Sequence, residues 1–322
     1  GVVGLGTYTG NSIRGPSSHN ALVGIRSTIG LTSRDGIVPL AFSHDIGGPM
    51  ARTVADAVAV FDVLAGTDPA DPTTVEADSL RAVDYNQFLD ANALASARIG
   101  VVRQIVDRES GDPRMRDLLN RALDDLRAAG AQIVDPVIIP MLDENVQFSC
   151  RRFRYDINAY LATLGPEAPV KTLTEIVESG GYDRTVRDRI RRGLEESLED
   201  PDIRCAEQTD NRKLLAQQVT GVLAAEQLDA LVYPTWANVP RLIGDLRSPG
   251  GDNSQVLSPQ TGFPAITVPM GWIEEGGQQL PGGLQIFGDA WSEPRLIAIA
   301  YAYEQATQHR RPPGTTPPLR QQ

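Results

Sequence analysis

The amino-acid sequence predicts an α/β protein in which helices pack on the faces of a central β-sheet. Residues 98–102 read as a strand, Asp112-Pro113 begins an amphipathic helix that stops at Gly130, and residues 131–134 read as the next strand. This order of strand, helix and strand is a right-handed crossover unit, which places both strands in one sheet. The apolar face of the helix carries Met115, Leu118, Leu119, Ala122 and Leu126.

A second amphipathic helix is predicted to follow Thr53. Thr53 and Asp56 have the spacing of a capping box, with aspartate in place of the usual glutamate or glutamine, and Gly66 ends the helix. Residues 68–73 contain two prolines and form a turn-rich loop that cannot continue it. The apolar residues spaced along one face are Val54, Ala57, Val58, Phe61 and Leu64.

The middle of the chain, from about residue 142 to 225, is predicted to be polar and helical. Its helices are separated by breaks at Gly165-Pro166, Gly180-Gly181 and Asp200-Pro201. Four aromatic residues in its first part either line a pocket or pack helices together, and we favour packing for each of them. They are Phe148, Phe153, Tyr155 and Tyr160.

Composition limits the class of protein. A chain of 322 residues with 41% hydrophobic residues can bury a substantial core. The net charge of -11 argues against a general nucleic-acid surface, and aspartates interrupt the arginine-rich run at 184–192. No stretch approaches the roughly 20 apolar residues of a membrane-spanning helix. We therefore predict neither a nucleic-acid nor a membrane partner, and a homodimer stays open.

The two cysteines give no sign of redox or metal chemistry. Cys150 and Cys205 lie 55 positions apart, and neither has a close cysteine or histidine partner. This spacing fits neither a CxxC motif nor a zinc site. We expect two buried free thiols, with a single disulfide as the alternative, and we predict no metal or organic cofactor.

A glycine-framed turn near the start of the chain presents one hydroxyl group. It reads Gly6-Thr7-Tyr8-Thr9-Gly10-Asn11-Ser12-Ile13-Arg14-Gly15 and comes directly after the apolar residues 2–5. A turn of this kind after a strand displays a serine as a nucleophile. Ser12 is therefore the candidate catalytic residue.

With the blocks that follow it, this turn resembles the amidase signature family. The blocks are Val23-Gly24-Ile25-Arg26-Ser27-Thr28-Ile29-Gly30, Ser33-Arg34-Asp35-Gly36-Ile37-Val38-Pro39-Leu40 and Gly48-Pro49-Met50-Ala51-Arg52-Thr53-Val54-Ala55-Asp56-Ala57. Residues 229–235, 261–271 and 280–288 resemble strands of the family, and residues 293–307 resemble its terminal helix. The resemblance implies a mixed central β-sheet covered by helices on both faces, N-terminally incomplete here.

The same resemblance implies a division of the chain. Residues 1–322 would form one partial amidase signature domain. Within it we expect a nucleophile-bearing core at 1–95, a variable helical region at 142–226 and a C-terminal core segment at 228–310.

The resemblance also implies the chemistry of an amide hydrolase that works through a serine acyl-enzyme. Ser12 falls on the family nucleophile, and the backbone N–H groups of Thr9, Gly10, Asn11 and Ser12 fall on its oxyanion hole. The substrate would be a small-molecule amide.

In the family, a lysine and a second serine held in a cis peptide activate the nucleophile, and both lie upstream of the motif. Neither position exists in these 322 residues. Lys171 and Lys213, the only lysines, sit in polar helical stretches and read as surface charges. We expect the missing N-terminal part of the same protein to be a necessary partner and this chain alone to be inactive.

Two residues of the turn depart from the family pattern. Tyr8 replaces an aspartate that would help to anchor the loop and pair with Arg14, and Asn11 replaces a glycine. Asparagine tolerates positive φ better than other non-glycine residues, so we expect the turn to survive. For Arg14 we favour bonds to backbone carbonyl groups over contact with a substrate carboxylate.

Two alternatives belong to other classes. His19, His44 and Asp45 lie close in sequence to Ser12 and allow a Ser-His-Asp esterase, although loop or surface histidines are the favoured interpretation. Tyr8, Asn11 and the absent upstream residues also fit a non-catalytic pseudoenzyme or binding module on the same fold.

Overall fold

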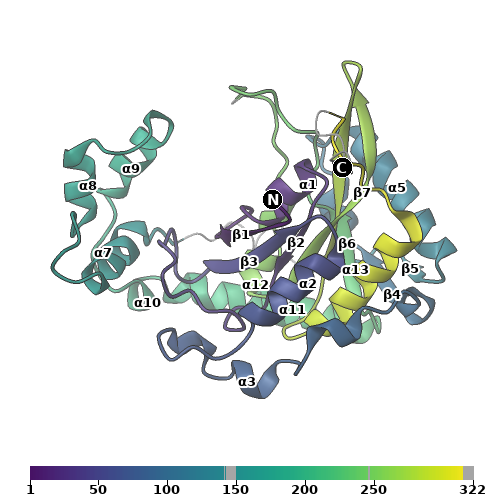
Figure 1. The fold of residues 1–322 in the computed structure, drawn as a ribbon, viewed down its shortest axis with the longest axis horizontal. Coiled ribbons are helices and arrows are strands. Elements are labelled where there is room, and N and C mark those ends of the chain that lie inside the picture. The colour runs from purple at the N-terminus through teal and green to yellow at the C-terminus, as the bar shows by residue number, and fades with distance from the viewer. Residues whose placement is uncertain (141, 143–149, 246, 315–322) are drawn as a thin grey trace, which may run out of the picture.

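The computed structural model describes residues 1–140, 142, 150–245 and 247–314 (Figure 1). Its described strands form one mixed eight-stranded sheet in the order β1-β3-β2-β7-β8-β6-β4-β5. The predicted α/β class with helices on both faces is confirmed. The strands are β1 (Val3–Tyr8), β2 (Val23–Arg26), β3 (Ile46–Ala51), β4 (Arg98–Val101), β5 (Gln132–Val134), β6 (Ala230–Pro234), β7 (Ala265–Glu275) and β8 (Gln278–Phe287).

The predicted helices after Thr53, from Pro113 and at 293–307 are present. The bounds of the described helices are α1 (Arg14–His19), α2 (Val54–Leu64), α3 (Ala77–Leu80), α4 (Arg103–Val106), α5 (Pro113–Ala128), α7 (Phe153–Thr163), α8 (Leu173–Ser179), α9 (Arg187–Gly193), α10 (Pro201–Arg204), α11 (Ala206–Ala225), α12 (Ser258–Thr261) and α13 (Glu293–Thr307). Of these, α1, α3, α4 and α12 were not predicted. Among the described residues, none of these helices is long and apolar enough to cross a membrane.

The predicted crossover unit is confirmed. β4 and β5 are parallel neighbours, with Ile99 opposite Ile133. Between them, Asp112 caps α5 by accepting a 2.9 Å hydrogen bond from the backbone N–H of Arg114. The apolar face predicted for α5 is buried, as is the face of α2 from Val54 to Phe61.

Helices cover the two faces of the central strands. On one side α13 contacts both α2 and α5, and on the other side α1 packs on β7 and β8. Adjacent glycines of β8 show this separation, because successive residues of a strand point to opposite faces. A Cβ atom on Gly282 would lie 2.6 Å from Cδ2 of Leu118 in α5, whereas one on Gly283 would lie 2.6 Å from Oγ of Ser18 in α1.

β1 forms an edge of the sheet and leads directly to the serine turn. It pairs with β3 in antiparallel register, with Tyr8 opposite Ile46. Val3 and Leu5 are exposed although they belong to the apolar segment at 2–5. Tyr8, the last residue of β1, is the only buried residue of this strand. Its burial fixes the end of the strand where the turn begins.

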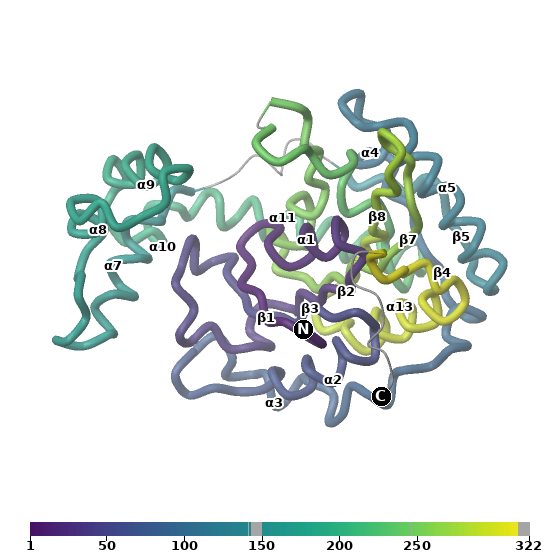
Figure 2. Tube along the Cα trace, turned by 45° about the horizontal axis from the view of Figure 1, so that its top comes forward, coloured from purple at the N-terminus to yellow at the C-terminus, as the bar shows by residue number. Residues whose placement is uncertain are grey.

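Helices α7, α8 and α9 lie apart from the sheet in both views (Figures 1 and 2). They pack around a small hydrophobic cluster of their own, centred on Ile157, Leu161 and Leu173. The predicted breaks fall where α7 and α8 end and where α10 begins. One link to the core is the backbone N–H of Phe42, which donates a 2.9 Å hydrogen bond to the buried carboxylate of Asp156.

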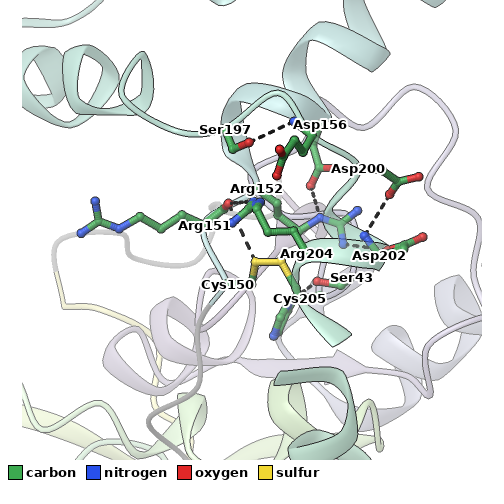
Figure 3. Close-up of a disulfide and its surroundings, with 12 residues drawn as sticks. Ser43, Cys150, Arg151, Arg152, Asp156, Ser197, Asp200, Asp202, Arg204 and Cys205 are labelled. Atoms are coloured by element: carbon green, nitrogen blue, oxygen red, sulfur yellow. Dashed lines mark hydrogen bonds and ion pairs between the residues drawn. A yellow bond between two sulfur atoms is a disulfide. The ribbon is translucent and has the colours of Figure 1, made fainter. Parts of the chain in front are cut away.

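A disulfide fastens this helical region to the start of α11. Cys150 and Cys205 are bonded with their Cα atoms 5.8 Å apart, so the expectation of two free thiols is wrong (Figure 3). The bond lies among charged side chains, and Arg204 donates a hydrogen bond to the backbone carbonyl of Arg151. Sequence spacing alone could not show that the two ends of a 55-residue segment meet.

Candidate active site

Ser12 lies in a tight turn between the end of β1 and the start of α1. Its side chain is exposed, and Oγ lies 3.4 Å from Oδ1 of Asn11. The backbone N–H of Gly15 donates a 2.7 Å hydrogen bond to the carbonyl of Asn11, which closes the turn. The hydroxyl therefore points to solvent and not into the core.

The backbone N–H groups of residues 9–12 have no acceptor among the described parts of the chain. Donors of this kind are free to meet a developing oxyanion. Neither Gly10 nor Asn11 has a positive φ. The turn therefore accommodates Asn11 without the left-handed conformation that asparagine tolerates. The side chain of Gln255 comes close to Gly10, where an added Cβ would lie 2.7 Å from Oε1.

Asp45 holds the first residue of the turn. It is 2% exposed, and the hydroxyl of Thr9 donates a hydrogen bond to its carboxylate. The backbone N–H groups of Leu40 and Ala41 each donate a further bond of 2.9 Å. Burial raises the pKa of Asp45, and these three hydrogen bonds oppose that rise. The carboxylate thus ties the turn to the loop that precedes β3.

Arg14 has the structural role that we favoured. Its side chain is fully buried, and Nη2 donates to the hydroxyl of Tyr8 and to the backbone carbonyl of Ser254, the latter at 2.8 Å. The Tyr8 hydroxyl also donates to that carbonyl, at 3.2 Å. Tyr8 therefore supplies the anchor expected of an aspartate. Burial raises the pKa of this phenol, while Arg14 and Arg26 lower it.

Residues from the far end of the sequence form one wall of the turn. Nε1 of Trp236 donates a 3.0 Å hydrogen bond to the carbonyl of Gly15. Asp252 interacts with the side chain of Asn11, and burial raises the pKa of this aspartate. Sequence reasoning missed both residues, although Trp236 directly follows a predicted strand. No spacing in the sequence relates Asp252 to the turn.

Neither His19 nor His44 is hydrogen-bonded to Ser12 among the described residues, so they do not form a Ser-His-Asp triad with it. The ring of His19 stacks on Trp236 with 4.6 Å between centroids, and burial lowers its pKa to about 4. Nδ1 of His44 lies 2.7 Å from Oγ of Ser43. Burial, followed by the charges of neighbouring arginines, lowers the pKa of His44 to about 3. Both rings are therefore neutral near pH 7.

Each lysine is engaged away from the turn. Nζ of Lys213 lies 3.3 Å from Oδ1 of Asp210 on the same exposed helix face. Nζ of Lys171 donates to the backbone carbonyls of Gly165 and Pro166. Both therefore fit the predicted role of surface charges.

Two clefts lie between the core and the helical region. Tyr160 lines one of about 500 Å³, together with Arg34 and Arg152. Phe153 lines another, of about 420 Å³. Both aromatic side chains also pack on the hydrophobic cluster of α7, as we favoured. Phe148 lies outside the described residues.

These features define an α/β protein with an exposed serine on a turn whose backbone N–H groups have no acceptor among the described residues. The family model described as Amidase matches residues 1–297. A probable amidase of Arabidopsis thaliana is 32% identical over 97% of this chain and 58% of its own length. A glutamyl-tRNA(Gln) amidotransferase chain of Gloeothece citriformis is 31% identical over 97% of this chain and 65% of its own length. The chain belongs to the Amidase family.

Solved structures agree with this assignment. The native peptide amidase of Stenotrophomonas maltophilia superposes with a TM-score of 0.81 and 37% identity, over 97% of this chain and 63% of that one. An amidase family protein of Bacillus anthracis superposes with a TM-score of 0.78 and 27% identity. The chain thus spans 58% to 65% of the length of these two curated relatives and of the peptide amidase structure.

Proposed function

We propose that the protein hydrolyses a carboxamide through an acyl-enzyme on Ser12. One observation carries the proposal: an exposed hydroxyl stands beside backbone N–H groups at residues 9–12 that have no acceptor among the described residues. A fixed donor directed at a developing oxyanion contributes about 3 kcal/mol to transition-state stabilisation. Membership of the Amidase family supports the choice of an amide.

The reaction divides into two steps. Oγ of Ser12 attacks the carbonyl carbon and gives its proton to a base, and the tetrahedral oxyanion accepts hydrogen bonds from the turn. Collapse of this intermediate expels ammonia or an amine, which takes up the proton. Water then attacks the acyl-enzyme, releases a carboxylic acid and regenerates the hydroxyl. An ester would react by the same route.

We propose that the base comes from a segment of the protein outside the residues given in this sequence. A serine hydroxyl is a weak nucleophile until a base activates it. The described lysines are engaged elsewhere, and each nearby histidine has another partner. We infer that a lysine and a second serine on another segment of the same protein complete the site. The 322 residues alone should then be inactive.

A serine-directed fluorophosphonate tests the proposal. The complete protein should be labelled at Ser12 and should release ammonia or an amine from carboxamides, and Ser12→Ala should abolish both activities. Ser79→Ala is the matched control, because Ser79 is also exposed but lies on α3. Absence of labelling in a folded complete protein would instead support the pseudoenzyme or binding module. Turnover by the isolated 322 residues that is lost in Ser12→Ala would show that the base lies within them.

A further inference from the structure

A third cleft lies where the end of β3, the middle of β7 and the last turn of α13 meet. It measures about 290 Å³. Val268 and Pro269 of β7 contribute buried apolar surface to it. Its polar lining includes Arg52, Glu304 and Arg310. Neither the turn that bears Ser12 nor its partners line this cleft, so it is separate from the candidate active site.

The two arginines of this cleft lack partners. Neither guanidinium has a hydrogen-bond acceptor or a salt bridge among the described residues, and Nε of Arg310 is buried without a hydrogen bond. Burial lowers the pKa of Arg310, the nearby positive charge of Arg52 lowers it further, and Glu304 opposes both effects. Two arginines that line another cleft are paired with carboxylates, Arg34 with Asp71 at 2.6 Å and Arg152 with Asp156 at 2.6 Å.

We propose that this cleft binds a phosphate oxyanion, as inorganic phosphate or as a phosphomonoester. Two guanidinium groups on one cleft provide the planar donor pairs that match phosphate oxygens. A bound dianion would also relieve the repulsion between the two like charges. The cleft is larger than one phosphate group requires, and its apolar wall of Val268 and Pro269 leaves room for a small organic substituent.

The carboxyl group of Glu304 does not cancel this positive charge. Its Oε1 accepts a 2.8 Å hydrogen bond from the backbone N–H of Val54. Burial raises its pKa to about 7, so at neutral pH much of it is protonated. His309 also lines the cleft, but Nε2 of its ring lies 2.9 Å from a carboxylate oxygen of Asp125. The lining therefore carries two positive charges against at most one negative charge from Glu304.

Calorimetric titration with inorganic phosphate and with phenyl phosphate tests the proposal. The titrations are run at pH 7 and constant ionic strength, with sodium chloride as the reference salt. We expect saturable binding of at least one phosphate probe, and at least a tenfold weaker Kd in Arg52→Gln and in Arg310→Gln. Arg311→Gln is the matched control, because Arg311 lies over the Trp272 ring, 5.8 Å from its centroid, and does not line the cleft. Circular dichroism spectra verify that each variant is folded.

The outcomes separate the two sources of phosphate. Tighter binding of phenyl phosphate assigns the cleft to a phosphomonoester, and equal or weaker binding assigns it to inorganic phosphate. Binding that weakens equally in Arg311→Gln, or tighter binding of succinate than of either phosphate probe, overturns the proposal. So does the absence of saturable heat with both phosphate probes. None of these measurements depends on catalysis at Ser12.

Discussion

The Tyr8→Phe substitution tests whether a phenol has replaced the anchoring aspartate of the serine turn. Tyr8 is 1% exposed and Arg14 is fully buried, so water cannot replace a hydrogen bond that is lost between them. The substitution removes one of the two acceptors of the Arg14 guanidinium and one donor to the carbonyl of Ser254. The aromatic ring stays, so no cavity forms.

The expected cost follows from these two bonds. A hydrogen bond to a charged group contributes about 2 kcal/mol, and a neutral one about 1 kcal/mol. Tyr8→Phe should therefore lower the free energy of unfolding by about 3 kcal/mol. The measurement is urea-induced unfolding of wild type and variant, with the slope of free energy against denaturant compared to verify that the unfolding reaction is unchanged.

Tyr303→Phe is the matched control. Tyr303 is fully buried like Tyr8, but its hydroxyl has no hydrogen-bond partner among the described residues. Removal of that hydroxyl should change stability by less than about 0.5 kcal/mol or increase it, since an unpaired buried polar group is unfavourable. If the two variants lose the same stability, the anchoring role of Tyr8 is wrong.

Three further predictions concern the disulfide, the histidines and one partly buried carboxyl group. The double variant Cys150→Ser, Cys205→Ser should lose about 4 kcal/mol in denaturant unfolding, because the disulfide closes a 55-residue separation; equal stability of oxidised and reduced wild type would contradict this. His19→Ala and His44→Ala should not change the pH–rate profile of the complete enzyme between pH 6 and 8. Burial keeps the pKa values of both histidines at about 4 or below, so neither ring titrates in this range. Glu304 has a folded-state pKa raised from 4.5 to about 7, so its contribution to stability is fully present below pH 4.5 and is lost as pH rises through 7. Glu304→Gln should flatten the pH dependence of the unfolding free energy in this window, and an unchanged dependence would refute the shift.

Local sequence patterns predicted the regular elements because their physical causes are local. For α5, the start at Asp112-Pro113 and the buried apolar face depend on neighbours within a few helical turns. The structure confirms both predictions. The same patterns could not show that Asp45 holds Thr9 or that Asp252 meets Asn11, because these pairs form only after distant segments pack. The disulfide was missed for the same reason.

The serine turn shows how long-range packing alters the interpretation of a substitution. From sequence alone, Tyr8 replaces an aspartate that would help to anchor the loop, and this replacement fits a module without chemistry. In the structure, the phenol reaches both Arg14 and the carbonyl of Ser254, so the anchor is kept.

What changes is charge: a carboxylate would have neutralised Arg14, whereas Nε and Nη1 of this arginine now have no hydrogen-bond partner among the described residues. The charge of Arg14 interacts instead with the carboxylate of Asp252, where burial raises the pKa and Arg14 lowers it. The substitution at position 8 is therefore compatible with acyl transfer, and it cannot by itself be taken as a sign of lost activity.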